Sequence, residues 1–194
     1  MPTPTRDEAW KLVEEWIESD SLRKHLLGVE AGMRAYARKL DQDEELWGVT
    51  GLLHDLDYER YPDLDTGHPR KAIELFEKKG YPQELIDAVA GHAPFLNVAR
   101  ETPLARTLYA VDELTGFISA CAMVRPTGIE GMKPKSVKKK LKQPSFAAGV
   151  NREEVEEAVE DLEGVEFDDH LELLIEATQE RSHDLGLAAD QQPG

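Results

Sequence analysis

The chain has 194 residues, of which 32% are charged and 40% hydrophobic, and its formal net charge is −16 at pH 7. This length suits one domain with a substantial core, and the acidity argues against a nucleic-acid polymer as partner, because phosphates attract clustered Lys and Arg. No apolar run approaches the roughly 20 residues of a membrane-spanning helix. We therefore expect a soluble protein with no membrane partner.

The first residues, MPTPTRDEAW, are polar and lack the apolar stretch and small-residue cleavage site of a signal peptide. We accordingly expect a cytoplasmic protein. The single cysteine, Cys121, lies in the apolar run ISACAMV and is most simply a small buried hydrophobic residue.

Helical patterning dominates the chain, and no run of alternating apolar and polar residues indicates a strand. At the start, Trp10, Val13, Trp16 and Ile17 share one face of an amphipathic helix. The pattern therefore predicts an all-α fold. In chain order, helices are predicted over residues 6–18, 19–40, 43–56, 68–80, 82–92 and 102–124.

Several helix ends carry recognisable signals. Residues 19–21 offer N-caps for the second helix, and Thr102 offers one for the long sixth helix. Pro69 and Pro82 stand at plausible first helical positions, and Gly80 is a plausible helix stop. The long sixth helix is largely apolar, so we expect it to form the centre of the core.

The composition changes after residue 126. Residues 128–150 are rich in Gly, Pro and Lys, and amphipathic acidic helices are predicted over 151–164 and 168–185. We interpret residues 1–125 as the core of the protein and residues 126–185 as a helical extension packed on that core. The last residues, 186–194, are expected to form a disordered tail.

An adjacent His-Asp pair, His54 and Asp55, ends the apolar part of GLLHDLDYERYPD, where burial of both groups is costly without a partner. Other histidines and a carboxylate lie on or beside separate predicted helices. Mixed nitrogen and oxygen ligands of this kind suit Fe, Mn, Co, Ni or Zn. The candidate metal ligands are His25, His54, Asp55, His68, His92 and Asp112.

Asp55 is the candidate bridging ligand, because a carboxylate can bind two cations and a neutral imidazole cannot. Any one of these histidines taken alone would more commonly be a satisfied core or surface residue. The ordered set of six favours a metal site. Gly28 and Gly32 lie on the same helical face as His25, so a neighbouring helix or a substrate can approach closely there.

Cationic residues that could bind a phosphorylated substrate are few in this acidic chain. Arg125 follows the sixth helix and precedes a Pro-containing turn, and six lysines lie between residues 133 and 142. Lys135 and Lys138 are the candidates within that segment. The alternative interpretation of the lysines is a solvated helix face.

The residues that follow the His-Asp pair are further candidates. Arg60 could contact phosphate or belong to a surface loop. Asp57 and Glu59 could position water, but we expect them to solvate the loop, and we expect Tyr58 and Tyr61 to serve in packing.

This pattern resembles the HD superfamily of metal-dependent phosphohydrolases, over roughly residues 21–123. The matching residues are His25, the adjacent His54 and Asp55, and Asp112 on the long helix. The segments TGHPRKA and AGHAPF resemble the additional histidines of the subgroup that binds two metals.

The resemblance implies an HD-domain helical bundle with a divalent metal centre, in which a metal-bound hydroxide attacks phosphorus and Asp55 is catalytic. The expected substrate is a phosphate ester or anhydride of a small nucleotide-like metabolite. A mixed-valent di-iron oxygenase on the same ligands and a non-catalytic regulatory module are the alternatives. The implied first metal site is His25, His54, Asp55 and Asp112, and the implied second site is Asp55, His68 and His92.

Overall fold

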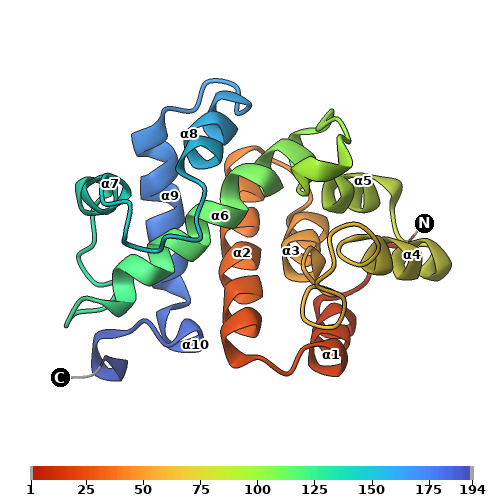
Figure 1. Cartoon of the computed structure of the whole chain (residues 1–194), viewed down its shortest axis with the longest axis horizontal. Helices are drawn as coiled ribbons and strands as arrows, with labels where there is room; N and C mark the ends of the chain where they lie inside the picture. Colours follow the sequence, from red (N-terminus) through yellow and green to blue (C-terminus); the bar gives the residue numbers. More distant parts are fainter. Residues whose placement is uncertain (1, 193–194) are drawn as a thin grey trace.

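The computed structural model describes residues 2–192, and all regular structure in that range is helical (Figure 1), which confirms the all-α prediction. The first half contains α1 (Arg6–Trp16), α2 (Asp20–Lys39), α3 (Glu44–Leu53), α4 (Arg70–Lys79), α5 (Gln83–Gly91) and the 3₁₀ helix η1 (Pro94–Leu96). The second half contains α6 (Pro103–Met123), α7 (Pro134–Leu141), α8 (Arg152–Glu160), α9 (Phe167–Glu180), α10 (Ser182–Leu185) and the 3₁₀ helix η2 (Ala189–Gln191).

The helix ends follow the local signals in the sequence. The side chains of Ser19 and Thr102 accept hydrogen bonds from backbone N–H groups in the first turns of α2 and α6. Gly80 ends α4 in the left-handed conformation, with φ of 68°. Pro69 and Pro82 are the residues immediately before α4 and α5, whereas the prediction made each of them the first helical residue.

Helix α6 crosses the molecule between two groups of helices (Figure 1). One apolar cluster joins α1, α3, α4 and α5, and the other surrounds α6 with parts of α2, α7, α8 and α9. Helix α6 has twelve buried residues. It is therefore the central helix that its apolar sequence predicts. Cys121 is among them and is buried without a disulfide partner.

Two glycines allow α2 to lie very close to α6. A Cβ atom on Gly28 would lie 2.9 Å from Cγ2 of Thr115, and one on Gly32 would lie 2.7 Å from Cγ1 of Val111. Real Cβ atoms do not approach so closely, so these positions require glycine. The close approach is therefore made by a neighbouring helix, and it sets the distance between His25 on α2 and the middle of α6.

His170 links α9 to this central pair of helices. Its imidazole is fully buried, with Nε2 3.0 Å from the backbone oxygen of Ala110 and Nδ1 hydrogen-bonded to the hydroxyl of Tyr36. Burial lowers the pKa of His170 to about 4, although its hydrogen bond to Ala110 acts in the opposite direction. His170 is therefore a neutral structural residue at neutral pH.

The C-terminal segment differs from the expected disordered tail. Leu187 and Ala188 are buried, and the N–H of Ile129 donates a 3.0 Å hydrogen bond to the backbone oxygen of Leu187. Residues 186–192 thus pack on the loop that follows α6, while residues 193–194 lie outside the described residues. Within residues 2–192, no helix combines the length and apolar character that a bilayer crossing requires.

Candidate metal centre

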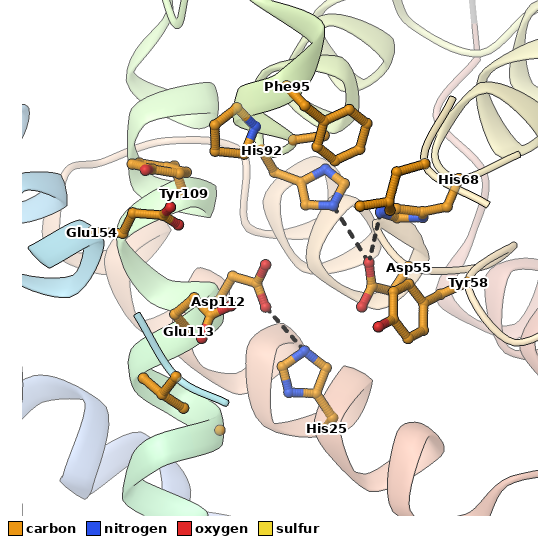
Figure 2. A pocket seen from close by; sticks show the side chains of 15 residues that line it. His25, Asp55, Tyr58, His68, His92, Phe95, Tyr109, Asp112, Glu113 and Glu154 are labelled. Carbon is orange, nitrogen blue, oxygen red and sulfur yellow. Dashed lines mark ion pairs between the residues drawn. The ribbon is translucent and has the colours of Figure 1, made fainter. Parts of the chain in front are cut away.

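The six candidate ligands converge from five parts of the chain. Figure 2 shows Asp55 between His68 and His92, and His25 facing Asp112. The predicted third helix ends three residues early, so that His54 caps α3 and Asp55 lies in the following turn. The other ligands are His25 on α2, His68 before α4, His92 after α5 and Asp112 in the middle of α6.

The two oxygens of Asp55 face different histidines. Oδ2 lies 3.6 Å from Nε2 of His54. Oδ1 lies 3.5 Å from Nε2 of His68 and 3.4 Å from Nε2 of His92. This carboxylate therefore stands between two groups of imidazoles, which is the position that a bridging ligand needs.

Asp112 completes the first group. Its Oδ1 lies 3.0 Å from Nε2 of His25 and 3.3 Å from Nε2 of His54. His54 is fully buried, and its Nε2 has no partner with hydrogen-bond geometry. An orphaned buried nitrogen is costly unless a ligand binds it.

Three of the histidines are oriented through their other ring nitrogen. Nδ1 of His54 lies 2.8 Å from the backbone oxygen of Gly51, and Nδ1 of His92 lies 2.5 Å from that of Val89. Because a carbonyl oxygen only accepts, Nδ1 must carry a proton in each of these rings, and Nε2 is the nitrogen that faces the site. Metal-binding histidines are held in this way.

The third oriented histidine, His68, uses a carboxylate that we expected to be solvated. Asp57 is fully buried, and its Oδ1 lies 2.8 Å from Nδ1 of His68. Its Oδ2 accepts a 2.8 Å hydrogen bond from the N–H of Ala72 in α4. Glu59 is exposed, as expected, and it also accepts hydrogen bonds from the N–H groups of Glu18 and Ser19 just before α2.

The electrostatics of the site favour positive charge. Burial alone lowers the pKa of His54, but the carboxylates of Asp55 and Asp112 outweigh it and raise that pKa to about 10. Burial likewise acts to raise the pKa values of Asp55 and Asp112, yet the neighbouring imidazoles hold both well below the ordinary range. The carboxylates thus stay ionised and require cationic partners.

The geometry of the donor atoms fits divalent metal ions. Ligand atoms of His25, His54 and Asp55 lie within 4.8 Å of one another, and so do those of Asp55, His68 and His92. A third such group combines His54, His92 and Asp112. With the orphaned Nε2 of His54, this set of nitrogen and oxygen donors meets the requirements of a transition-metal site.

A cavity of about 380 Å³ opens over these ligands. Glu113, beside Asp112, belongs to its wall, and burial together with the charge of Asp112 raises its pKa to about 7. No Lys or Arg is among the residues that line it in the described part of the chain. The remaining wall residues are Tyr58, Leu64, Ala93, Pro94, Phe95, Tyr109, Gly116, Val150 and Glu154.

The structure does not bring the predicted substrate-binding arginines to this cavity. Arg60 instead donates to the backbone oxygen of Glu15, and its guanidinium lies 5.2 Å from the ring centroid of Trp16. Arg125 donates a 2.8 Å hydrogen bond to the backbone oxygen of Glu130, within its own loop. Both side chains therefore hold local structure, and those two predictions are corrected.

The lysine prediction is corrected in the same way. Lys135 and Lys138 lie on α7, which packs on α9 and on α6 (Figure 1). Nζ of Lys138 lies 2.5 Å from Oδ1 of Asp168 on α9, and Lys135 is exposed. The basic segment thus forms the largely solvated helix face that was the alternative interpretation.

The sequence interpretation missed several wall residues. Tyr58 was expected to serve only in packing, but it lines the cavity with its ring 5.2 Å from that of His68, in an edge-on arrangement. Glu113 had a signal in the sequence, because it follows Asp112 directly. Glu154 had none, since it belongs to an acidic helix with the pattern of a solvated face.

Comparison with known families supports this interpretation of the site. The model of the HD domain family matches residues 22–116, a segment that includes all six candidate ligands. HD domains bind divalent metal ions and are commonly metal-dependent hydrolases. Neither a curated protein nor a solved structure matches the chain. Residues 22–116, just under half of the chain, are therefore identified as an HD domain.

Proposed function

We propose that the protein is a metal-dependent phosphohydrolase with a dinuclear centre, which cleaves a phosphate ester of a small, nucleotide-like metabolite. Asp55 is the residue shared between the two metal sites and is essential for catalysis. The first site consists of His25, His54, Asp55 and Asp112, and the second consists of Asp55, His68 and His92.

The observation that carries the proposal is the division of the Asp55 carboxylate. One of its oxygens faces His54, and the other faces His68 and His92. A single-metal site would not need imidazoles on both oxygens of one carboxylate. The arrangement is therefore what a shared ligand between two cations requires.

Divalent cations bound there would offset charge on the phosphoryl oxygens and make a bound water more acidic. The residues of this chain do the positioning. The Nδ1 hydrogen bonds of His54, His68 and His92 fix the ring orientations before any ligand binds. Tyr58 and Phe95 line the cavity at the His68 and His92 side and can exclude water around a bound substrate (Figure 2).

The wall composition favours one phosphoryl group over a polyphosphate chain. Anhydrides such as nucleoside triphosphates carry several charges, which proteins usually balance with Lys or Arg. The residues that line this cavity in the described chain include neither. The charge of a bound phosphoryl group would then be balanced by the metal ions alone. This arrangement suits a phosphomonoester, because it has a single phosphoryl group to place at the metal centre.

The test is phosphate release by purified protein loaded separately with Mn, Fe, Co, Ni or Zn, against a panel of phosphomonoesters and nucleotides. We expect release with at least one metal, and its loss together with bound metal in Asp55→Ala. Asp65→Ala, an acid-to-alanine change at an exposed position ten residues away, is the control that keeps both. Oxygen consumption by the Fe(II) form without phosphate release would replace the proposal with the oxygenase. Bound metal with neither activity would replace it with a regulatory module.

A further inference from the structure

Two carboxylates that are not candidate metal ligands face the cavity. Glu113 projects from α6 beside Asp112, and Glu154 projects from α8 on the same side (Figure 2). Glu154 accepts a 2.7 Å hydrogen bond from the side-chain amide of Asn151, which carries no charge. Both carboxylates therefore lie on a cavity wall that offers them no cationic side chain.

Aromatic rings flank these carboxylates. Tyr109 lies next to Glu154, and Phe95 and Tyr58 stand on the other side of the cavity (Figure 2). Ring faces attract cations, and attraction grows where water is excluded. The guanidinium of Arg100 stacks on Tyr109, 3.8 Å from the ring centroid. Arg100 does not line the cavity, and its charge is balanced by Asp161, which lies 3.3 Å away.

The charge balance of the cavity points to the ligand. Four carboxylates line it, and two of them, Asp55 and Asp112, are candidate metal ligands. Glu113 and Glu154 are left facing the space where the organic part of a substrate would lie. An anionic organic group would be repelled there, and a neutral one would leave Glu113 and Glu154 without a cationic partner.

An independent observation shows that this cavity is built to bind. Asp55 and Asp112 line the floor of the cavity, and the Nε2 atom of His54, which is fully buried beside both of them, has no hydrogen-bond partner. The floor thus offers a prepared site for cations that hold a phosphoryl group. The wall with Glu113 and Glu154 lies beside that site, within the same small cavity.

We propose, on the basis of the proposed function, that the substrate is a small phosphomonoester whose organic part carries an ammonium group. The phosphoryl group faces the metal ligands, and the ammonium group lies between Glu113 and Glu154, against Tyr109. In the reaction, a water oxygen forms a bond to phosphorus and the ester P–O bond breaks. The ester oxygen gains a proton, so the products are an amino alcohol and inorganic phosphate.

The test compares two esters that differ by one group, 3-aminopropyl phosphate and n-butyl phosphate, with metal-loaded protein. Charge-assisted hydrogen bonds to the ammonium group should raise kcat/KM for the amino ester roughly tenfold or more over the butyl ester. In Glu154→Gln and in Glu113→Gln, this ratio should fall toward one. Glu153→Gln removes the same charge from an exposed neighbouring position on α8 and should leave the ratio unchanged.

Equal kcat/KM values for the two esters in the unaltered protein would overturn the inference, and this comparison needs no variant to fold. If neither ester nor any other phosphate ester is hydrolysed, the proposed function fails instead. Calorimetric titration of both esters into the metal-loaded protein then decides the inference. Tighter binding of the amino ester that is lost in Glu154→Gln would support it, and equal affinity would overturn it.

Discussion

Asp57 and His68 form a buried pair in which Nδ1 of the imidazole lies 2.8 Å from a carboxylate oxygen. The second oxygen of Asp57 accepts from the N–H of Ala72, so the same carboxylate also fixes the first turn of α4. One buried side chain thereby joins the turn after the His-Asp pair to the next helix and orients a candidate metal ligand. It is the supporting hydrogen bond that metal-binding histidines characteristically have.

The change Asp57→Asn should weaken the second metal site without unfolding the protein. Loss of the charged partner of His68 should lower affinity for that metal roughly 10- to 100-fold. Competition with a chromophoric chelator measures the affinity. Glu59→Gln is the matched control, because the Glu59 carboxylate likewise accepts backbone hydrogen bonds, here from Glu18 and Ser19, but contacts no candidate ligand. An Asp57→Asn protein with unaltered affinity for both metals would show that the pair is purely structural.

Removal of the second-site imidazoles should reduce the metal count. In His68→Ala and in His92→Ala we expect metal content to fall from about two ions per chain toward one, because each loses a ligand of the second site only. Elemental analysis of the metal-replete proteins measures this. His183→Ala is the control, since the His183 side chain is 73% exposed and lies outside the site. If the count stays the same in both variants, His68 and His92 are not ligands.

The α2–α6 contact predicts a stability effect at Gly32. The Cβ in Gly32→Ala would lie 2.7 Å from Val111 and 2.9 Å from Leu174, which forces the helices apart. Overpacking of this kind costs about 1 to 3 kcal/mol, which the better helix propensity of Ala offsets only in part. Urea denaturation measures the change. Gly149→Ala, where a Cβ meets nothing within 4 Å, should show no such loss, and equal stabilities would contradict the packing account.

His170 should make the protein less stable in acid. Its pKa is about 4 in the folded protein and near 6.5 in the unfolded chain, so between these values only the unfolded chain gains the proton. Its contribution to stability is therefore complete above pH 6.5 and is lost as pH falls toward 4. From pH 7.5 to pH 5 the loss should be about 2 kcal/mol from this group.

The variant His170→Gln retains a donor for Ala110 and an acceptor for Tyr36 but does not titrate. Its free energy of unfolding should be lower than that of the unaltered protein at pH 7.5, with a smaller decrease between pH 7.5 and pH 5. Denaturation curves at both pH values provide the measurement. The same decrease in both proteins would assign the acid sensitivity to other groups.

Local signals explain what the sequence predicted well. The helix type and most helix ends depend on apolar periodicity, caps such as Ser19 and stops such as Gly80, all of which act within a few residues. The six candidate ligands were recognisable because histidine and aspartate, which commonly bind metals, recur on or beside these helices. Gly28 and Gly32 likewise predicted a close approach, and the structure shows that α6 makes it.

Long-range contacts explain what the sequence did not predict. Asp57 is buried because α4 docks on it, and the fit of Leu187 against the loop after α6 depends on a hydrogen bond from Ile129, 58 positions earlier. Arg60 and Lys138 have long side chains whose direction is decided by their tertiary neighbours. Composition indicated that these residues were cationic but could not indicate that they point away from the cavity.

The central claim is that one carboxylate, Asp55, is shared between two metal ions. The most direct test is the number of metal ions per chain in the metal-replete, unaltered protein, measured by elemental analysis after removal of loosely bound metal. The account predicts a value near two. A value near one, or no retained metal, would contradict it.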